Sequence, residues 1–201
     1  MTATDNAWGE DQRLGLSIHH ALEDASKRLK VLKGKNKRPW LEISRSEVDK
    51  TYLNHQLRTL RKLHVTPLEV FWDRLATDTY YDKERLPLHS DHLWRVYEIL
   101  YPQDTSYLSS QALQLSGIHG LTSLWIDQGR IIGRKGSIKG RYSDQEYENL
   151  SQWLQDYWNI KCHLRQNQSA IFQLSLNREA LETLIDTITP AVHHAMKKKL
   201  R

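Results

Sequence analysis

Apolar residues recur every three or four positions in several stretches of the chain, which is the spacing of α-helices with one buried face. One such helix is predicted to open at Ser46 and another at Ser143, each with acidic residues in its first turn. The two apolar faces consist of Tyr52, Leu53, Leu57 and Leu60 in the first helix, and of Tyr147, Leu150, Leu154 and Tyr157 in the second. Further helices are predicted over residues 91–100 and 178–188, and a last basic helix follows Pro190.

Short segments rich in β-branched and aromatic residues lie between these helices and predict strands. They cover residues 68–75 and 77–85 in the first half of the chain, and 160–165 and 170–176 in the second half. Residues 129–141 predict a tight β-hairpin rather than a helix, because four glycines surround the apolar pair Ile131 and Ile132. Each half of the chain therefore has an approximate α-β-β-α-β-β-α order.

The two halves of the chain resemble each other beyond this order of elements. In each half a short segment ends in acidic or amide residues, a basic cluster follows, and a helix opened by serine comes next. Leu53 and Leu57 match Leu150 and Leu154 at one constant offset. We therefore expect an α+β fold of two pseudo-symmetric αββαββα repeats: a polar tail at 1–12, a first repeat at 13–102, a junction at 103–120 and a second repeat at 121–201.

Basic residues are concentrated at equivalent places in the two halves. The 201 residues include 29 Lys and Arg against 24 Asp and Glu, a formal net charge of +5. Arginines on a two-stranded ribbon can pair with guanine edges in the major groove of DNA, and lysines can pair with phosphates. The alternative, that each cluster is an ordinary exposed loop, stays open. The predicted nucleic-acid-binding residues are Lys33, Lys35, Lys37 and Arg38 in the first cluster, and Arg130, Arg134, Lys135, Lys139 and Arg141 in the second.

The sequence also excludes several classes of protein. The single cysteine, Cys162, allows neither an internal disulfide nor a multi-cysteine zinc site, which fits a reducing compartment such as the bacterial cytoplasm or an organelle interior. The histidine pairs lack further ligands at zinc spacing. No apolar run approaches the ~20 residues that cross a bilayer, and the first twelve residues are polar. We expect an intracellular protein with no membrane partner.

The tryptophans divide into two groups. Trp94, Trp125, Trp153 and Trp158 lie at helical spacing among leucine and isoleucine residues, so we predict that they belong to the core. Trp40 and Trp72 lie in predicted strands near basic residues. These two are the tryptophans that we consider for contact with nucleic acid.

Several short motifs follow one another in a recognisable order. Residues 121–129 read Leu-Thr-Ser-Leu-Trp-Ile-Asp-Gln-Gly, residues 142–154 form an acidic helix start, and residues 188–200 run from Ile-Thr-Pro to a closing Lys-Leu. Together they resemble the second half of a single-chain, two-repeat LAGLIDADG homing endonuclease. In that family, small residues such as Thr122 and Ser123 let the two motif helices cross closely. The resemblance implies a saddle of antiparallel sheets and a monomer with internal pseudo-twofold symmetry that binds DNA or structured RNA.

The resemblance also implies where a nuclease centre would lie. In the family, an acidic residue at the end of each motif helix holds a divalent cation, usually Mg²⁺, and the matching positions here are Asp24 and Gln128. The amide of Gln128 is a poorer Mg²⁺ ligand than a carboxylate, so the second motif is degenerate. Lys199 matches the closing lysine of the family, and Asp127 is a candidate displaced metal ligand. The implied catalytic positions are thus Asp24, Gln128 and Lys199, with Mg²⁺ as cofactor if the protein is active.

Three functional hypotheses follow from the resemblance. The first is a nucleic-acid-binding protein derived from a homing endonuclease, with double-strand cleavage lost or impaired, as in an intron maturase or another RNA-binding relative. The second is an active or nicking site-specific DNA endonuclease in which Asp24 supports one Mg²⁺. The third is a structural subunit of a ribonucleoprotein such as a ribosome. For single residues, Asp24 with Lys27 and Arg28 could form a solvated helix pair, and residues 197–199 could form a basic tail.

Overall fold

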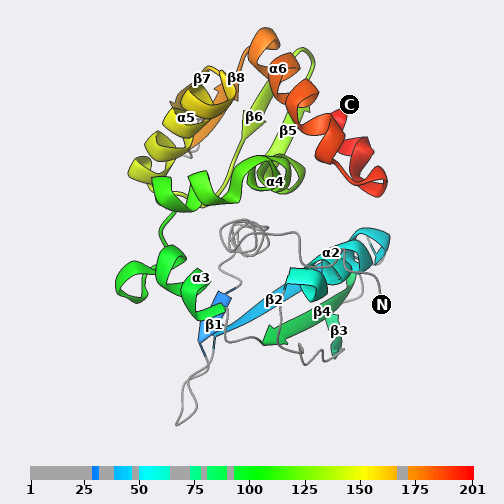
Figure 1. The fold of residues 1–201 in the computed structure, drawn as a ribbon. Coiled ribbons are helices and arrows are strands. Elements are labelled where there is room, and N and C mark those ends of the chain that lie inside the picture. Colours follow the sequence, from blue (N-terminus) through cyan, green and yellow to red (C-terminus); the bar gives the residue numbers. More distant parts are fainter. Residues whose placement is uncertain are drawn as a thin grey trace, which may run out of the picture.

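The computed structural model describes residues 29–31, 39–46, 50–63, 73–77, 81–89, 93–166 and 172–201. These residues form two antiparallel sheets of four strands, each accompanied by helices. Figure 1 shows the two sheets at opposite ends of the molecule, with helix α4 between them. None of the helices within these ranges is both long enough and apolar enough to span a lipid bilayer.

Both sheets have the same strand order. The first half contains β1 (Leu29–Val31), β2 (Pro39–Ser46), α2 (Lys50–Leu63), β3 (Asp73–Thr77), β4 (Tyr81–His89), α3 (Leu93–Leu100) and the 3₁₀ turn η2 (Pro102–Asp104). The second half contains α4 (Ser110–Gln128), β5 (Gly129–Ile132), β6 (Lys135–Ile138), α5 (Asp144–Trp158), β7 (Cys162–Gln166), β8 (Phe172–Leu176), α6 (Arg178–Ile188), η3 (Thr189–Ala191) and η4 (His194–Leu200). The strand orders are β1-β2-β4-β3 and β5-β6-β8-β7, so the predicted α+β class with two similar antiparallel sheets is confirmed.

The core of the second half lies between its sheet and three helices. Ile138, Leu174 and Leu176 are fully buried on one face of the sheet. Helices α4, α5 and α6 cover this face, and the core cluster includes Trp125 from α4 and Leu150 from α5. Leu53 in α2 and Leu150 in α5, which the sequence predicts to be equivalent, are both buried. The side chain of Leu57, predicted to match Leu154, lies outside the described residues.

The tryptophan prediction is confirmed for most of the described residues. Trp125 and Trp153 are buried, and Trp158 packs against the core cluster. Trp94 is only half-buried and meets Tyr97 edge-on, with ring centroids 6.2 Å apart. Of the two tryptophans considered for nucleic acid, one lies in β2 opposite Lys30 and His89, and the other, Trp72, falls outside the described residues.

Two features of the predicted helices are wrong. Tyr157 was expected on the apolar face of its helix, but it is 55% exposed, because Trp153 and Leu154 fill the last buried turn of α5 before Asn159 takes a left-handed conformation. The first helix was expected to open at Ser46, but Ser46 is the last residue of β2 and α2 begins at Lys50. The basic segment after Pro190 is helical as predicted, and it forms the 3₁₀ helix η4. Its short run of turns follows from the tight i to i+3 pattern that begins at His193, whose carbonyl accepts from the amide of Met196 at 2.8 Å.

Helix α4 consists of two parts that meet at Gly117. This residue has φ 53° and ψ −145°, a conformation that side chains other than hydrogen disfavour. Ser116 closes the first part by donating from Oγ to the carbonyl of Leu113 at 2.8 Å. The second part carries Thr122 and Ser123, which are both buried, and it ends at Gln128 directly before β5. The break thus lets one continuous segment leave the junction and still deliver Gln128 to the sheet.

Helix α5 is fixed at its start by a capping box. The Ser143 side chain accepts from the amide of Glu146, and the Glu146 carboxylate accepts from the amide of Ser143 at 2.8 Å. The other carboxylate oxygen of Glu146 accepts from the amide of Leu108 at 2.8 Å. One buried glutamate therefore caps α5 and also ties the segment before α4 to it.

Candidate nucleic-acid interface and second half-site

The predicted basic hairpin is formed by β5 and β6. Its strands pair antiparallel from Gly129 opposite Ile138 to Ile132 opposite Lys135. The two-residue loop consists of Gly133 and Arg134, and Gly133 has φ 61°. A left-handed glycine at the first loop position is typical of a type II′ turn, which suits the twist of a hairpin. The hairpin interpretation of residues 129–141 is therefore confirmed.

One face of the second sheet is left to solvent by the helices, and we call it the basic face. On β6 and β8 its residues alternate with buried ones, since Gly136, Ile138, Leu174 and Leu176 point to the core. Register places Arg130, Ser137, Ser175 and His163 in one row across all four strands. The basic face comprises Arg130, Ile132, Lys135, Ser137, His163, Arg165, Gln173 and Ser175.

The basic face carries positive charge without compensation from its own strands. Arg130, Lys135 and Arg165 are exposed, and none of the four strands contains Asp or Glu. Arg134 in the turn is exposed as well, as are Lys139 and Arg141 after β6. A flat face with cations, hydroxyls and amides offers phosphate contacts and hydrogen bonds to base edges. The four predicted residues of the first basic cluster, Lys33, Lys35, Lys37 and Arg38, lie outside the described residues.

Gln128 lies where α4 meets the hairpin. Its backbone carbonyl accepts from the amide of Lys139 at 3.2 Å, which extends the β5–β6 ladder by one pair. Its side chain is only 9% exposed and turns toward Gly140, where an added Cβ would lie 2.6 Å from Gln128 Oε1. Within the part of the chain that the structure describes, neither Oε1 nor Nε2 has a well-formed hydrogen bond. The Gln128 amide is therefore turned inward.

Two tyrosines surround the Gln128 side chain. Burial raises the pKa of Tyr142 far above its ordinary range. The nearby Gln128 amide lowers this pKa, and Tyr147, more weakly, raises it. The rings of Tyr142 and Tyr147 meet edge-on with centroids 5.3 Å apart. Tyr147 Oη accepts from the amide of Gly140 at 3.1 Å, and it lies 3.0 and 2.9 Å from the carbonyls of Gly140 and Phe172, to either of which it can donate. The surroundings of Gln128 are thus neutral phenols and backbone rather than charged ligands.

Of the other predicted site residues, the structure describes Lys199 and Asp127. Lys199 has an exposed side chain, and its backbone carbonyl accepts from Trp125 Nε1 at 3.1 Å. Asp127 is half-buried beside Gln128 in α4. Asp24 lies outside the described residues. The structure therefore brings the C-terminal segment to α4 through a backbone contact.

Comparison with known proteins gives one consistent result for the fold. No protein-family model matches the chain, and no curated protein sequence matches it. Among solved structures, the homing endonuclease I-WcaI bound to its DNA recognition sequence aligns with a TM-score of 0.73 at 15% identity, over 96% of this chain and 88% of that one. A variant of I-DmoI in complex with its target DNA and Mg aligns with a TM-score of 0.66 at 13% identity, over 91% and 98%.

A third structure extends the comparison beyond the endonucleases. The N-terminal LAGLIDADG domain of WhiA aligns with a TM-score of 0.53 at 10% identity, over 96% of this chain and 90% of that one. This protein has the LAGLIDADG homing endonuclease fold. At these identities the likeness establishes the fold alone. It confirms the resemblance found in the sequence motifs, while the roles of single residues rest on their own geometry.

A divalent cation does not fit the described part of the second half-site, by which we mean the end of α4 at Gln128 and the residues around it. Mg²⁺ prefers carboxylate oxygens and bound water, whereas the Gln128 position supplies a neutral, inward-turned amide. The described residues contain no group of three or more His, Cys, Asp or Glu side chains arranged to hold a metal ion. The described residues of this half-site therefore do not support a metal-dependent reaction step.

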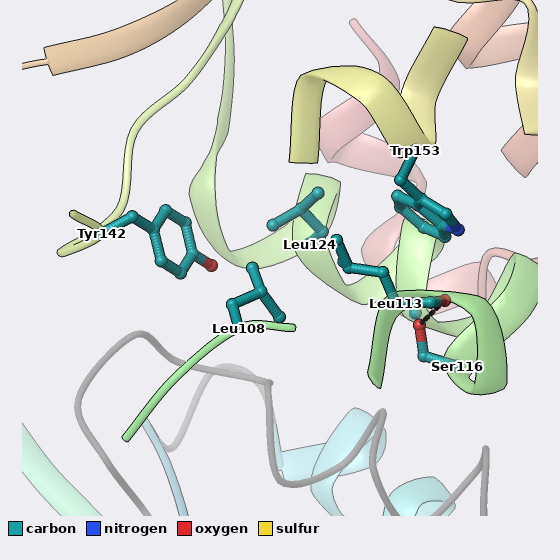
Figure 2. Close-up of a pocket in the computed structure, with 7 residues that line it drawn as sticks. Leu108, Leu113, Ser116, Leu124, Tyr142 and Trp153 are labelled. Atoms are coloured by element: carbon teal, nitrogen blue, oxygen red, sulfur yellow. Dashed lines mark hydrogen bonds between the residues drawn. The ribbon is translucent and has the colours of Figure 1, made fainter. Parts of the chain in front are cut away.

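A small cavity lies beside α4, toward the junction, and Tyr142 is part of its lining (Figure 2). Its lining includes Leu108, Leu113, Leu124 and Trp153, with the Ser116 hydroxyl already engaged with the Leu113 carbonyl. The cavity has a volume of about 10 Å³, which is room for no more than a single water molecule. The cavity is a packing gap and not a binding site for a small-molecule substrate.

Six of the eight residues of the basic face were not predicted from the sequence, and four of these six lie on the second pair of strands. His163, Arg165, Gln173 and Ser175 lie on β7 and β8, and none of them falls in a cluster of basic residues. The available signal was the period-two alternation in residues 172–176, where Leu174 and Leu176 face the core and the residues between them face outward. Pairing of β6 with β8 was also needed to place these residues beside the hairpin.

Proposed function

We propose that this protein binds nucleic acid through the basic face and has lost, or largely lost, double-strand cleavage. Both parts of the proposal start from the same point in the fold, the junction of α4 with β5. The hairpin that begins there presents the cations, and the helix that ends there presents Gln128 in place of an acid. Binding and cleavage are thus separable in this chain.

The single observation that carries the loss of cleavage is the state of the Gln128 side chain. An amide cannot supply the negative charge that a carboxylate gives a divalent cation. This amide is also buried against Gly140 and next to Tyr142, so its oxygen is directed away from solvent. Two changes would be needed for metal binding here: a carboxylate at residue 128 and a different rotamer.

The nucleic-acid part of the proposal is supported by the charge of the basic face and by the solved structures that the chain resembles. The basic face has exposed Arg130, Lys135 and Arg165 and no acidic residue in its strands. The structures of I-WcaI and I-DmoI named above are complexes with DNA. Polyanion binding of this kind releases counterions and is therefore steeply dependent on salt.

An active or nicking endonuclease is the alternative in which Asp24 supports one Mg²⁺. Structures of I-DmoI with DNA contain Mn or Ca, which makes divalent metals the natural cofactors to supply in a test. The test uses supercoiled plasmids that carry candidate target sites, incubated with the protein and Mg²⁺, with nicked and linear products counted. We expect the same background with the natural protein and with Asp24→Asn.

Strand breaks that Asp24→Asn abolishes would contradict the loss of cleavage. Cleavage gained by Gln128→Asp would support the amide as its cause. A role in a ribonucleoprotein makes a different prediction, since the protein would then co-purify with a defined RNA or a ribosomal particle. An RNA-binding function of the maturase type would appear as binding to a structured intron RNA in preference to duplex DNA.

A further inference from the structure

Ile132 stands out on the basic face. It is the last residue of β5 and is 65% exposed, more than Tyr157 at 55% or Leu164 at 39%. Its neighbour Ile131 packs against the core cluster, so the alternation of the strand directs Ile132 outward. The Ile132 side chain is therefore not part of the core cluster.

The neighbours of Ile132 give its exposure a meaning that a lone surface isoleucine would lack. It pairs across the hairpin with Lys135, and Arg130 lies two residues earlier on the same face of β5. The other residues of the basic face are Lys, Arg, His, Gln and Ser, so Ile132 is its one apolar member. An apolar side chain set between two cations matches a ligand with an apolar spot between anionic groups.

The major groove of DNA is such a ligand. Each thymine presents a C5 methyl group there, beside acceptor atoms of the bases and between two rows of phosphates. A two-stranded ribbon fits this groove, whereas the major groove of A-form RNA is too narrow for side chains to read. Uracil also lacks the methyl group. The pattern of one apolar and two cationic side chains on a ribbon therefore favours DNA over RNA.

We propose that Ile132 reads the C5 methyl group of a thymine in the DNA major groove, with Arg130 and Lys135 holding the hairpin against the flanking acceptors and phosphates. The inference rests on the proposed nucleic-acid-binding function and narrows its ligand to duplex DNA. It makes Ile132 a specificity-determining residue rather than a contributor to bulk affinity.

The test begins with selection of binding sites from a duplex DNA library with a random 30-base-pair core. We expect the selected sites to share a thymine that faces the hairpin. Replacing each thymine of the selected site in turn by deoxyuridine removes only one methyl group, and at one position we expect affinity to fall about three- to fivefold. Because the change is made in the DNA, this result does not depend on a protein variant that folds.

Two variants assign the effect to Ile132. Ile132→Ser is expected to bind the thymine and deoxyuridine sites with equal affinity. Leu164→Ser is the matched control, because Leu164 is a partly exposed apolar residue of the same sheet that pairs with buried Leu174 on the opposite face. This variant is expected to keep the three- to fivefold preference for thymine.

The outcomes separate the inference from the function on which it rests. Binding of duplex DNA with no loss at any deoxyuridine position would overturn the inference alone, as would a preference for thymine that persists in Ile132→Ser. Tighter binding to structured RNA than to any selected DNA would also overturn the inference while leaving nucleic-acid binding intact. If binding to nucleic acid does not depend on salt, or if neither DNA nor RNA binds, the proposed function and the inference are overturned together.

Discussion

The indole nitrogen of Trp125 donates a hydrogen bond to the backbone carbonyl of Lys199 at 3.1 Å. Trp125 is one turn before Gln128 in α4, and Lys199 belongs to η4, so this bond holds the C-terminal segment against the central helix. The contact uses the main chain of Lys199, and the side chain with its ammonium group is exposed to solvent. The position of Lys199 is therefore set by Trp125 and not by its own charge.

Stability measurements can separate these two roles of Lys199. Trp125→Phe removes the donor and leaves a gap in the core, so we expect it to lower the free energy of unfolding by about 2–4 kcal/mol. Lys199→Ala keeps the carbonyl and should change stability by less than about 0.5 kcal/mol. Urea denaturation monitored by far-ultraviolet circular dichroism, which reports on the backbone and not on tryptophan fluorescence, provides both values. A loss above about 1 kcal/mol in Lys199→Ala would show that the side chain also has a structural role.

Glu146 provides the second prediction. Its carboxylate accepts from the amides of Leu108 and Ser143 and from the Ser143 hydroxyl, at 2.8, 2.8 and 2.9 Å. Glu146→Ala leaves the buried amide of Leu108 without its acceptor and removes half of the capping box, so we expect a loss of about 2–4 kcal/mol in unfolding free energy. Glu148→Ala, an exposed change in the same helix, is the control and should stay within about 0.5 kcal/mol. Equal losses in the two variants would rule out the proposed tie.

The start of α5 also illustrates what could be predicted from the sequence. Ser143 and the acidic turn behind it are local signals, because a capping residue bonds to amides two or three positions away. The hairpin was equally local, since Gly133 supplies the left-handed φ that a two-residue loop requires. The second bond of Glu146 was not predictable in this way, because Leu108 is 38 residues distant in sequence.

The second half-site shows the same limit. The motif placed Gln128 at the end of a helix, and α4 does end there. The inward turn of the side chain depends on Gly140 and Tyr142, which approach only when β6 has paired with β5. The prediction for Tyr157 was wrong for a related reason: periodicity assigned it to the apolar face, but burial also requires a packing partner, and this side chain is 55% exposed. Local pattern therefore predicted the elements, and tertiary contacts decided the site.

The inward position of Gln128 leads to a third prediction. Gln128→Glu places a carboxyl group in the space beside Tyr142, where burial favours its neutral form and raises its pKa. A raised pKa means that stability is fully present below the ordinary glutamate pKa and is lost as pH rises. We expect Gln128→Glu to be close to the natural protein at pH 4 and less stable by about 2 kcal/mol or more at pH 8. Gln128→Leu, of similar size and without charge, should change stability by less than about 1 kcal/mol at both values, because no well-formed hydrogen bond is lost.

Urea denaturation at the two pH values provides the comparison. A Gln128→Glu variant whose stability does not depend on pH would mean that the side chain turns outward to solvent. Such a variant would also be the one to examine first for regained cleavage, because its carboxylate would be accessible to a cation.

A histidine cluster joins the first half of the chain to the C-terminal segment and leads to a fourth prediction. The rings of His55 in α2 and His193 before η4 stack with centroids 4.3 Å apart, and His194 lies 4.1 Å from His193. Burial, followed by His55, His194 and Arg58, lowers the pKa of His193. A lowered pKa means that the folded state binds its proton at lower pH than the unfolded state does, so stability is present above about pH 6.5 and declines as pH falls below it.

His193→Asn tests this dependence without removing the helix cap. His193 Nδ1 accepts from the amide of Ala195 at 3.3 Å, and asparagine is a favoured residue for the same role. We expect the decline in stability between pH 7 and pH 5 to be smaller in His193→Asn than in the natural protein. His163→Asn, which changes an exposed histidine on the basic face, should leave the decline unchanged. The same decline in His193→Asn as in the natural protein would assign it to other groups.

The last prediction concerns the salt dependence of nucleic-acid binding. Arg134 and Lys135 are exposed at the tip of the hairpin, where each can neutralise one phosphate. For duplex DNA, loss of one phosphate contact reduces the slope of log affinity against log salt concentration by about 0.9, so we expect about 0.9 for Arg134→Ala and about 1.8 for the double variant with Lys135→Ala. Arg178→Ala is the control of equal charge change, because Arg178 lies on α6 behind the sheet and pairs with Glu182 at 2.7 Å. Filter binding across a salt series measures the slopes for the natural protein and for the three variants. If Arg178→Ala lowers the slope as much as Arg134→Ala does, binding follows net charge alone and the basic face has no special role.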